Sequence, residues 1–150
     1  MRYKSLHALL LIIVCFMAYF LKPVYADDST LIAENAWISE APPVSRVMVA
    51  YMTLKNTGPQ AIEIVRAESD LYSSIEFHET IHQDGMAKMV RHDSLIIAAN
   101  DKLELKRGGA HLMLFNPAKR LTAGDTVTIK LTTKNNTSKT ILVKVKKAQF

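Results

Sequence analysis

The sequence has one cysteine, few aromatic residues and no apolar run long enough for an ordinary membrane span. Of its 150 residues 7% are aromatic, and glycine and proline occur five times each. The longest apolar stretch, Ala8 to Leu21, has 14 residues, whereas a spanning helix needs roughly 20. With 22% charged and 49% hydrophobic residues, this composition excludes a collagen-like repeat, a disordered tail and a multi-span membrane protein. The length fits one domain.

The N-terminal segment has the pattern of a secretory signal peptide. Arg2 and Lys4 precede the apolar run, and Val24 and Ala26 supply the small side chains that a signal peptidase accepts before its cut. We therefore expect residues 1–26 to be a cleaved signal peptide and the protein to be periplasmic. A retained membrane anchor is the alternative, and it would be the only contact with the membrane.

Cleavage would leave residues 27–150 as a single mature domain without cysteine. The one cysteine, Cys15, lies in the apolar run, and Val14 precedes it where a lipoprotein signal needs a small residue, so lipidation is not expected. The mature domain then has no disulfide, no thiol catalysis and no thiolate-bound zinc. Its formal charge falls from +5 to +2, because Arg2, Lys4 and Lys22 leave with the signal.

Short β-like runs separated by turn residues cover the mature domain. We expect strands at Ala36–Ser39, Arg46–Lys55, Ala61–Ala67, Ser74–His82, Met86–Arg91, Ser94–Ile97, Lys102–Lys106, His111–Phe115, Thr126–Thr133 and Thr140–Lys146. Asp84-Gly85 predicts a hairpin turn, and only Ser69–Ser74 and Pro117–Leu121 have a pattern compatible with a helical turn. Many short strands with regular turn signals indicate an all-β domain, either an antiparallel sandwich or a barrel.

The last third of the chain is rich in lysine and has no acidic residue after Asp125. One interpretation is a solvated edge hairpin, whose lysines prevent edge-to-edge pairing. The other is a surface for an acidic partner. Nucleic acid is not an expected partner, because the protein is predicted to be exported and no aromatic residues interleave with the lysines.

Histidines and methionines cluster in the middle of the mature domain. Strand periodicity places His111 and Met113 on one face of a strand whose other face carries Leu112 and Leu114. On an earlier strand His78 lies on the polar face, and the hairpin that follows returns either Met86 or Met89 to its side. The pattern therefore predicts a site built from imidazole and thioether groups.

Imidazole nitrogen and thioether sulfur form a soft, uncharged donor set, and soft ligands select Cu(I). Thioethers carry no proton, so acid affects such a site only through its histidines. Met48 and Met52 are interpreted as core residues, and His92 as an ordinary exposed histidine. The histidine at position 82 shares a face with His78 and, like the methionine at position 86, remains open as an additional or alternative ligand.

The spacing His78-x10-Met89-x21-His111-x-Met113 resembles the signature of the periplasmic copper chaperones called PCu(A)C. The flanks are similar as well, including Ala36-Trp37 before Pro42-Pro43, the run Ala50–Asn56, the hairpin Asp84–Met89 and the run Gly108–Leu114. The resemblance covers about Ala36 to Thr133. It implies a cupredoxin-like antiparallel β-sandwich with Greek-key topology that binds one Cu(I) per chain, near the surface, through His78, Met89, His111 and Met113.

The same resemblance implies a role in copper delivery. The acceptor would be the apo copper domain of cytochrome c oxidase subunit II, with its binuclear copper centre, and a Sco-like protein with a thioredoxin fold would be a second partner. Two departures from the family are visible. Glu79 stands where some members have methionine, and no histidine or methionine follows Met113, so we expect one copper site and not two.

Other classes of protein fit the sequence less well. A blue-copper protein needs a cysteine ligand, and a hydrolase needs a nucleophile motif that does not accompany Glu76 and Glu79, so we expect no enzymatic activity. A periplasmic copper storage or tolerance protein would have the same ligands. A non-metal interaction β-sandwich, in which the histidines and methionines are incidental, is the third alternative.

Overall fold

A computed structural model describes residues 30–148 of the chain, so the predicted signal peptide and its cleavage site lie outside the described residues. This part contains ten strands. They are β1 (Leu31–Ser39), β2 (Val47–Asn56), β3 (Ile62–Glu68), β4 (Tyr72–Gln83), β5 (Met86–His92), β6 (Leu95–Ile97), β7 (Lys102–Leu105), β8 (Ala110–Pro117), β9 (Thr126–Thr133) and β10 (Ser138–Lys146).

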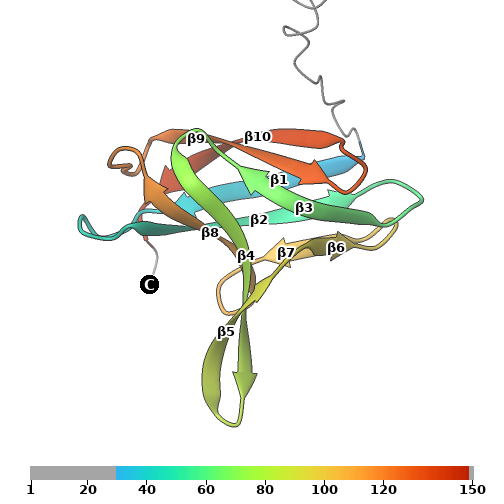
Figure 1. The fold of residues 1–150 in the computed structure, drawn as a ribbon, viewed down its shortest axis with the longest axis horizontal. Helices are drawn as coiled ribbons and strands as arrows, with labels where there is room; N and C mark the ends of the chain where they lie inside the picture. The colour runs from blue at the N-terminus through green and yellow to red at the C-terminus, as the bar shows by residue number, and fades with distance from the viewer. Residues whose placement is uncertain (1–29, 149–150) are drawn as a thin grey trace, which may run out of the picture.

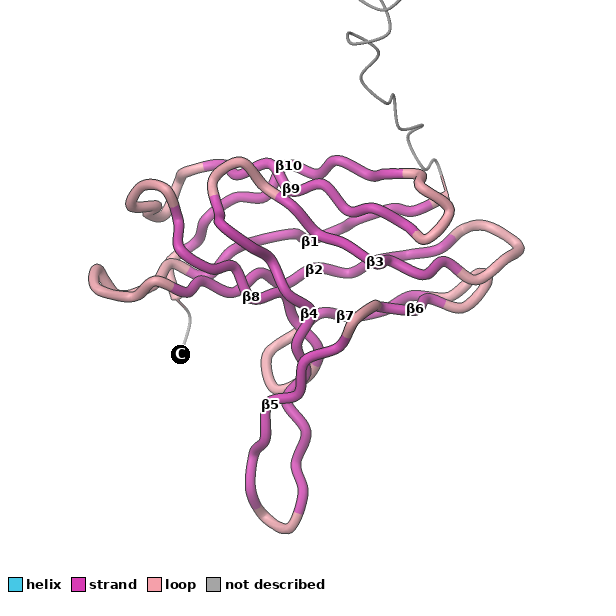
Figure 2. The backbone as a smooth tube through the Cα atoms, in the orientation of Figure 1, coloured by secondary structure: helices cyan, strands magenta, loops and turns pink. Residues whose placement is uncertain are grey.

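Seven of these strands form a closed barrel, in the order β4-β8-β2-β1-β10-β9-β3. Two pairings between distant segments make the closure possible. The first is a parallel pairing of β1 with β10, which includes Trp37 opposite Lys144. The second joins β3 to β4, where Ala67 lies opposite Ile75. Figures 1 and 2 show β9 and β10 on the side of the molecule opposite to β6 and β7, which pair with β3 and β2.

The prediction of an all-β domain is confirmed, whereas the two-sheet Greek-key sandwich is not: the strands close into a barrel. Local periodicity in the sequence predicts where strands lie but not which strands pair, and here the pairing of the first and last strands of the order closes the sheet into a barrel. Neither segment with a pattern compatible with a helical turn forms a helix, and residues 30–148 contain only strands, turns and loops. Accordingly, that part of the chain has no helix that could cross a membrane.

The barrel interior is filled by alternating side chains of the barrel strands. On β2 the residues Met48, Ala50, Met52 and Leu54 are buried, while their neighbours in sequence are partly exposed. Both methionines are therefore core residues, as predicted. On β8 the buried residues Leu112 and Leu114 point inward, so the odd-numbered residues of this strand lie on the outer face of the wall.

The β4–β5 hairpin extends away from the barrel as a two-stranded arm, which is visible below the barrel in Figure 1. Strand β4 pairs with β8 from Tyr72 to Glu79 and with β5 from Phe77 to Gln83. The two pairings overlap only at residues 77–79, where the arm leaves the wall. His78 thus has a cross-strand neighbour on each side, His111 of β8 and Arg91 of β5.

Candidate metal centre

Two of the predicted ligands meet at the base of this arm. His78 and His111 are directly paired across β4 and β8, and paired residues of an antiparallel ladder have their side chains on the same face. Their ring centroids are 6.2 Å apart, with an angle of 25° between the ring planes. The structure therefore places these two imidazoles side by side on the outer face of the barrel wall.

The imidazole of His111 is buried and held in one tautomer. The residue is only 4% exposed, and its Nδ1 is 2.9 Å from the carbonyl oxygen of Gly109. A carbonyl oxygen only accepts hydrogen bonds, so Nδ1 must carry the proton and donate it. The same carbonyl oxygen accepts a bond of 3.1 Å from the backbone N–H of Thr80. The β7–β8 turn thus fixes the ring and leaves Nε2 as the basic nitrogen.

The imidazole of His78 is held in the opposite tautomer. Its Nε2 lies 2.8 Å from Oε2 of Glu76 and donates to this carboxylate. The other nitrogen, Nδ1, is buried without a hydrogen-bond partner, and within residues 30–148 it is the one buried side-chain nitrogen or oxygen in that condition. An unsatisfied buried polar atom costs about 1–3 kcal/mol. Such an atom therefore points to a ligand that the protein receives from outside.

The two predicted methionines share the face of the two histidines. On β8, Met113 is two residues beyond His111 and lies opposite Glu76 of β4. On β5, Met89 lies opposite Thr80, which is two residues beyond His78 along β4. Because side chains two residues apart on a strand share a face, both thioethers lie on the histidine side of the sheet. Met113 is partly buried, whereas Met89 is 52% exposed.

The same strand periodicity decides whether the two residues that the sequence left open as additional ligands lie on the histidine face. Met86 is paired with Gln83 and is three residues from Met89, so it lies on the opposite face of the hairpin. The histidine at position 82 is on the His78 face but four residue pairs further out along the arm, and it is exposed. His92 lies on the other face, where its Nε2 is 2.9 Å from Glu79.

A row of aromatic side chains continues the histidine face across the barrel wall. Tyr51 of β2 lies next to His111, with ring centroids 6.5 Å apart, and next to Trp37 of β1, at 4.9 Å. Arg107, in the β7–β8 turn, places its guanidinium carbon 5.7 Å from the centre of the Trp37 ring and 6.0 Å from that of Tyr51. Trp37 thus lies beside the candidate site, one residue removed from it.

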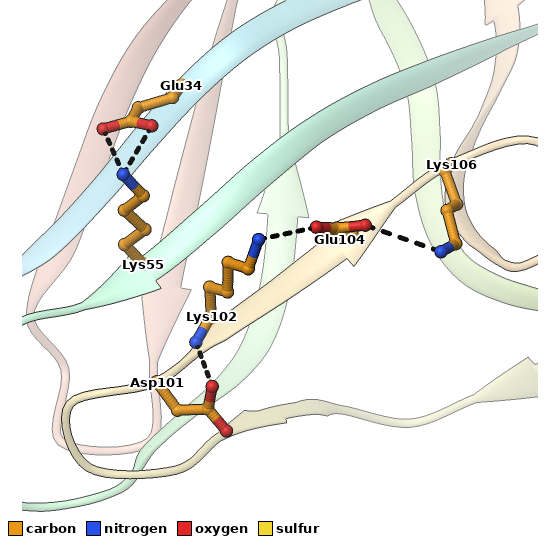
Figure 3. A network of polar contacts seen from close by, with 6 residues as sticks. All are labelled: Glu34, Lys55, Asp101, Lys102, Glu104 and Lys106. Atoms are coloured by element: carbon orange, nitrogen blue, oxygen red, sulfur yellow. Dashed lines mark hydrogen bonds and ion pairs between the residues drawn. The ribbon is translucent and has the colours of Figure 1, made fainter.

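A network of charged side chains lies close to the turn that holds His111 (Figure 3). On β7, Glu104 is 2.8 Å from the ammonium of Lys102 and 3.5 Å from that of Lys106, the residue at which the β7–β8 turn begins. The hydrogen bond from Lys102 lowers the pKa of the Glu104 carboxyl. These groups are exposed, so they contribute little to stability, and the network contains neither histidine nor methionine.

Sequence reasoning found the candidate ligands but not the groups that orient them. Glu76 was visible two residues before His78 on the same strand face, and period two could have indicated that contact. The Gly109 carbonyl could not have been found, because a backbone oxygen has no sequence signal. Pro42 and Pro43, which belong to the family-like flanks, line a cavity of about 280 Å³ with Arg46, Met48 and Asn116 and with none of the candidate ligands.

The candidate donor set consists of these two histidines and two thioethers. In the part of the chain that the structure describes, no three histidine, cysteine, aspartate or glutamate side chains are arranged to hold a metal ion. The predicted set contains only two residues of these types, so this result is compatible with it. Chemically, two neutral imidazoles and two thioethers suit a soft monovalent ion such as Cu(I).

Comparison with known proteins assigns the family. Residues 31–145 match the family described as "Putative lipoprotein LpqE-like". The chain belongs to this family. The LpqE-like chain is 38% identical over 96 residues to the protein RP573 of Rickettsia prowazekii, covering 63% of this chain and 53% of the relative. It is 32% identical over 113 residues to a protein of Leifsonia xyli named as a lipoprotein, covering 75% and 67%. The match thus spans about half of the Rickettsia protein.

Solved structures with the same fold include domains that are named PCuAC. The copper-bound PCuAC domain from PmoF2 superposes with a TM-score of 0.67 at 18% identity, covering 85% of this chain and all of that domain. The Cu(I) form of DR1885 from Deinococcus radiodurans superposes with a TM-score of 0.65 at 33% identity, covering 80% of each chain. The resemblance of the LpqE-like chain to the PCu(A)C family is therefore confirmed.

Proposed function

We propose that this protein is an exported copper chaperone that binds one Cu(I) ion as cargo through His78, Met89, His111 and Met113. The observation that carries the proposal is the buried Nδ1 of His78, which has no hydrogen-bond partner and belongs to a ring adjacent to His111. Both imidazoles have one nitrogen committed to a hydrogen bond and one left basic. The solved relatives named as copper-bound and Cu(I)-bound proteins support the same cargo.

The chemistry of these side chains suits a carrier. Neutral imidazoles and thioethers hold Cu(I) without thiolates, so an acceptor with thiolate ligands can displace them. The four positions also differ in accessibility: His111 is 4% exposed, whereas Met89 is 52% exposed on the hairpin arm. An incoming ligand would therefore replace the Met89 thioether first, while the histidines at the base of the arm still hold the ion.

The proposed acceptor is the apo copper domain of cytochrome c oxidase subunit II, with a Sco-like protein as a second partner. The proposed location is the periplasm, which agrees with the signal-like N-terminus and with the relative from Leifsonia named as a lipoprotein. The family resemblance supports this proposed acceptor, and the N-terminal pattern supports this proposed location. A storage protein would bind the ion equally well, so only transfer distinguishes the two functions.

Binding is tested by anaerobic Cu(I) titration against a chromophoric chelator of known affinity. The wild-type protein should take up one ion per chain, and the double variant His111→Ala/Met113→Ala should take up none. Met52→Leu is the matched control, because it removes a thioether from the barrel core with little change in volume. Circular dichroism establishes that the variants fold. Undiminished uptake by the folded double variant would overturn the proposal.

Transfer is tested by mixing the Cu(I)-loaded protein with the apo copper domain of subunit II, in the absence and presence of a reduced Sco-like protein. A chaperone should lose its copper to one of these acceptors faster than buffer alone removes it. Retention of the ion in all mixtures would contradict delivery and favour storage. A strain lacking the protein should correspondingly lose oxidase activity before it becomes sensitive to copper.

A further inference from the structure

The two histidines of the candidate site have opposite hydrogen-bonding arrangements. Nε2 of His78 donates to Glu76, and Nδ1 of His111 donates to the carbonyl oxygen of Gly109. A metal-binding histidine usually donates its other ring N–H to a carboxylate or a carbonyl oxygen, which fixes the tautomer and the orientation of the ring. Both arrangements are present here, one of each kind.

We infer that Glu76 is a positioning residue that makes His78 bind copper through Nδ1, while His111 binds through Nε2. This inference rests on the proposed function. The basic nitrogen of each ring is set before the metal arrives, because the carboxylate and the carbonyl oxygen can only accept a proton donor. The unsatisfied nitrogen of His78 is the one that this assignment leaves for the metal.

The contacts of Glu76 explain why it acts on the ring and not on the metal. Its Oε2 is 2.8 Å from His78, and its Oε1 is 3.7 Å from the guanidinium of Arg91, so each carboxylate oxygen already faces a donor group. Across the ladder Glu76 lies opposite Met113, in the row of candidate ligands. A carboxylate is a hard ligand that suits Mg²⁺ and Ca²⁺, whereas Cu(I) prefers the neighbouring thioether and imidazoles.

Glu79 provides a matched control for this role. It is the same residue type, it lies one residue beyond His78 on β4, and its carboxylate also accepts from a histidine, His92, at 2.9 Å. Its side chain, however, is on the opposite face of the strand. The same substitution at Glu79 as at Glu76 should therefore remove the same charge from the same strand without affecting the candidate ligands.

The first experiment reads the tautomers directly. Long-range ¹H–¹⁵N correlation of ¹⁵N-histidine protein, recorded for the apo form and for the diamagnetic Cu(I) form, distinguishes protonated from unprotonated ring nitrogens. In both forms we expect His78 to be protonated at Nε2 and His111 at Nδ1. Copper bound to Nε2 of His78 would overturn the inference and leave the proposed function intact. A wild-type protein that binds no Cu(I) would overturn both.

The second experiment measures Cu(I) affinity by chelator competition. Loss of a partner that orients a metal-binding histidine typically costs about 10–100-fold in affinity, and we expect a loss in this range for Glu76→Ala. Glu76→Gln keeps an acceptor oxygen and should retain most of the affinity and the Nε2–H tautomer, and Glu79→Ala should match the wild type. Wild-type affinity in folded Glu76→Ala, or equal losses in Glu76→Ala and Glu79→Ala, would overturn the inference. The wild-type tautomer measurement holds even where a variant does not fold.

Discussion

Thr80 and Met89 are directly paired across the β4–β5 hairpin, and this pairing places the thioether of Met89 on the same face as His78. The turn at Asp84 and Gly85 determines the register, with positive φ angles of 54° and 75° at these two residues. A shift of one residue would turn Met86 toward the histidines and Met89 away from them. The arm thus selects one of its two methionines for the candidate site.

The first prediction concerns these two methionines. Met89→Leu removes a sulfur at nearly constant volume, and we expect it to weaken Cu(I) binding at least about tenfold, which corresponds to about 1.4 kcal/mol. Met86→Leu should bind like the wild type, since Met86 is on the far face and 69% exposed. Chelator competition on both variants provides the measurement. Equal weakening by the two substitutions would refute the selection of Met89 by the hairpin register.

The sequence was sufficient to predict most strands, because their burial alternates regularly. On β2 every second side chain is buried from Met48 to Leu54, and this alternation can be recognised in the amino-acid sequence. The first half of β1 was missed. It contains Asn35 with a φ of 53°, and the pairing with β2 shifts between Glu34 and Trp37. Such a bulge interrupts the alternation on which the prediction depends.

Closure of the barrel could not be predicted, because it depends on contacts between distant segments. The parallel pairing of β1 with β10 joins residues more than one hundred positions apart, such as Trp37 and Lys144. The candidate site likewise combines a local pattern that the sequence shows with a contact between distant segments that it does not show. The spacing of His78 and His111 placed them on polar strand faces, but only the pairing of β4 with β8 makes them neighbours. The Gly109 carbonyl that orients His111 has no side chain to recognise.

The second prediction concerns Asn56, a buried residue at the end of β2. Its amide nitrogen donates to the carbonyl oxygens of Gln60 and Ala98 at 2.6 and 3.0 Å, and its Oδ1 accepts from the Gly58 N–H at 2.9 Å. Asn56→Ala should lower the free energy of unfolding by about 2–3 kcal/mol, because it leaves buried backbone groups without partners. Urea denaturation provides the measurement.

Thr57→Ala is the control for that substitution. Thr57 makes an exposed hydrogen bond of 3.1 Å to the carbonyl oxygen of Thr30, and exposed substitutions usually change stability by no more than about 0.5 kcal/mol. Neither variant should change the Cu(I) affinity. If Asn56→Ala unfolds at the same urea concentration as Thr57→Ala, the buried amide does not stabilise the β2–β3 loop in the way its contacts indicate.

The third prediction is a pH dependence of stability that originates in Tyr72. Burial raises the pKa of the Tyr72 phenol to about 12, above the value of about 10 for an unfolded chain. The folded state therefore retains this proton over a range in which the unfolded state releases it. The resulting stabilisation is complete below pH 10, and about 2–3 kcal/mol of it is lost as the pH rises toward 12.

Tyr72→Phe isolates this contribution from the titration of the lysines. The difference in unfolding free energy between the wild type and the variant should be constant from pH 7 to 9. Between pH 10 and 12 the unfolding free energy of the wild type should then fall relative to that of Tyr72→Phe. The constant part reports the contact of the Tyr72 hydroxyl with the sulfur of Met48, at 3.2 Å. A difference that stays flat through pH 12 would show that the phenol ionises as easily in the folded protein as in the unfolded chain.

The fourth prediction tests the turn that orients His111. Gly108 has a φ of +71°, and an added Cβ would meet no atom within 4 Å, so Gly108→Ala affects only the backbone conformation. Its cost should be about 1–2 kcal/mol of stability. The strain is next to Gly109, whose carbonyl accepts from both His111 and the Thr80 N–H. We therefore expect Gly108→Ala to weaken Cu(I) binding severalfold, and Gly108→Asn, which tolerates positive φ, to weaken it less.

Gly124→Ala is the matched control, because Gly124 also has a positive φ, of +104°, and open space around its added Cβ. Its N–H bonds to the carbonyl oxygen of Val145, in a turn that contains none of the candidate ligands. It should destabilise the protein in the same way as Gly108→Ala yet leave the Cu(I) affinity unchanged. Thermal denaturation and chelator competition on both variants separate the two effects. If both glycine variants bind Cu(I) like the wild type, the Gly109 carbonyl does not control the His111 ring, and the orientation of that ring comes from its packing against Tyr51 and His78.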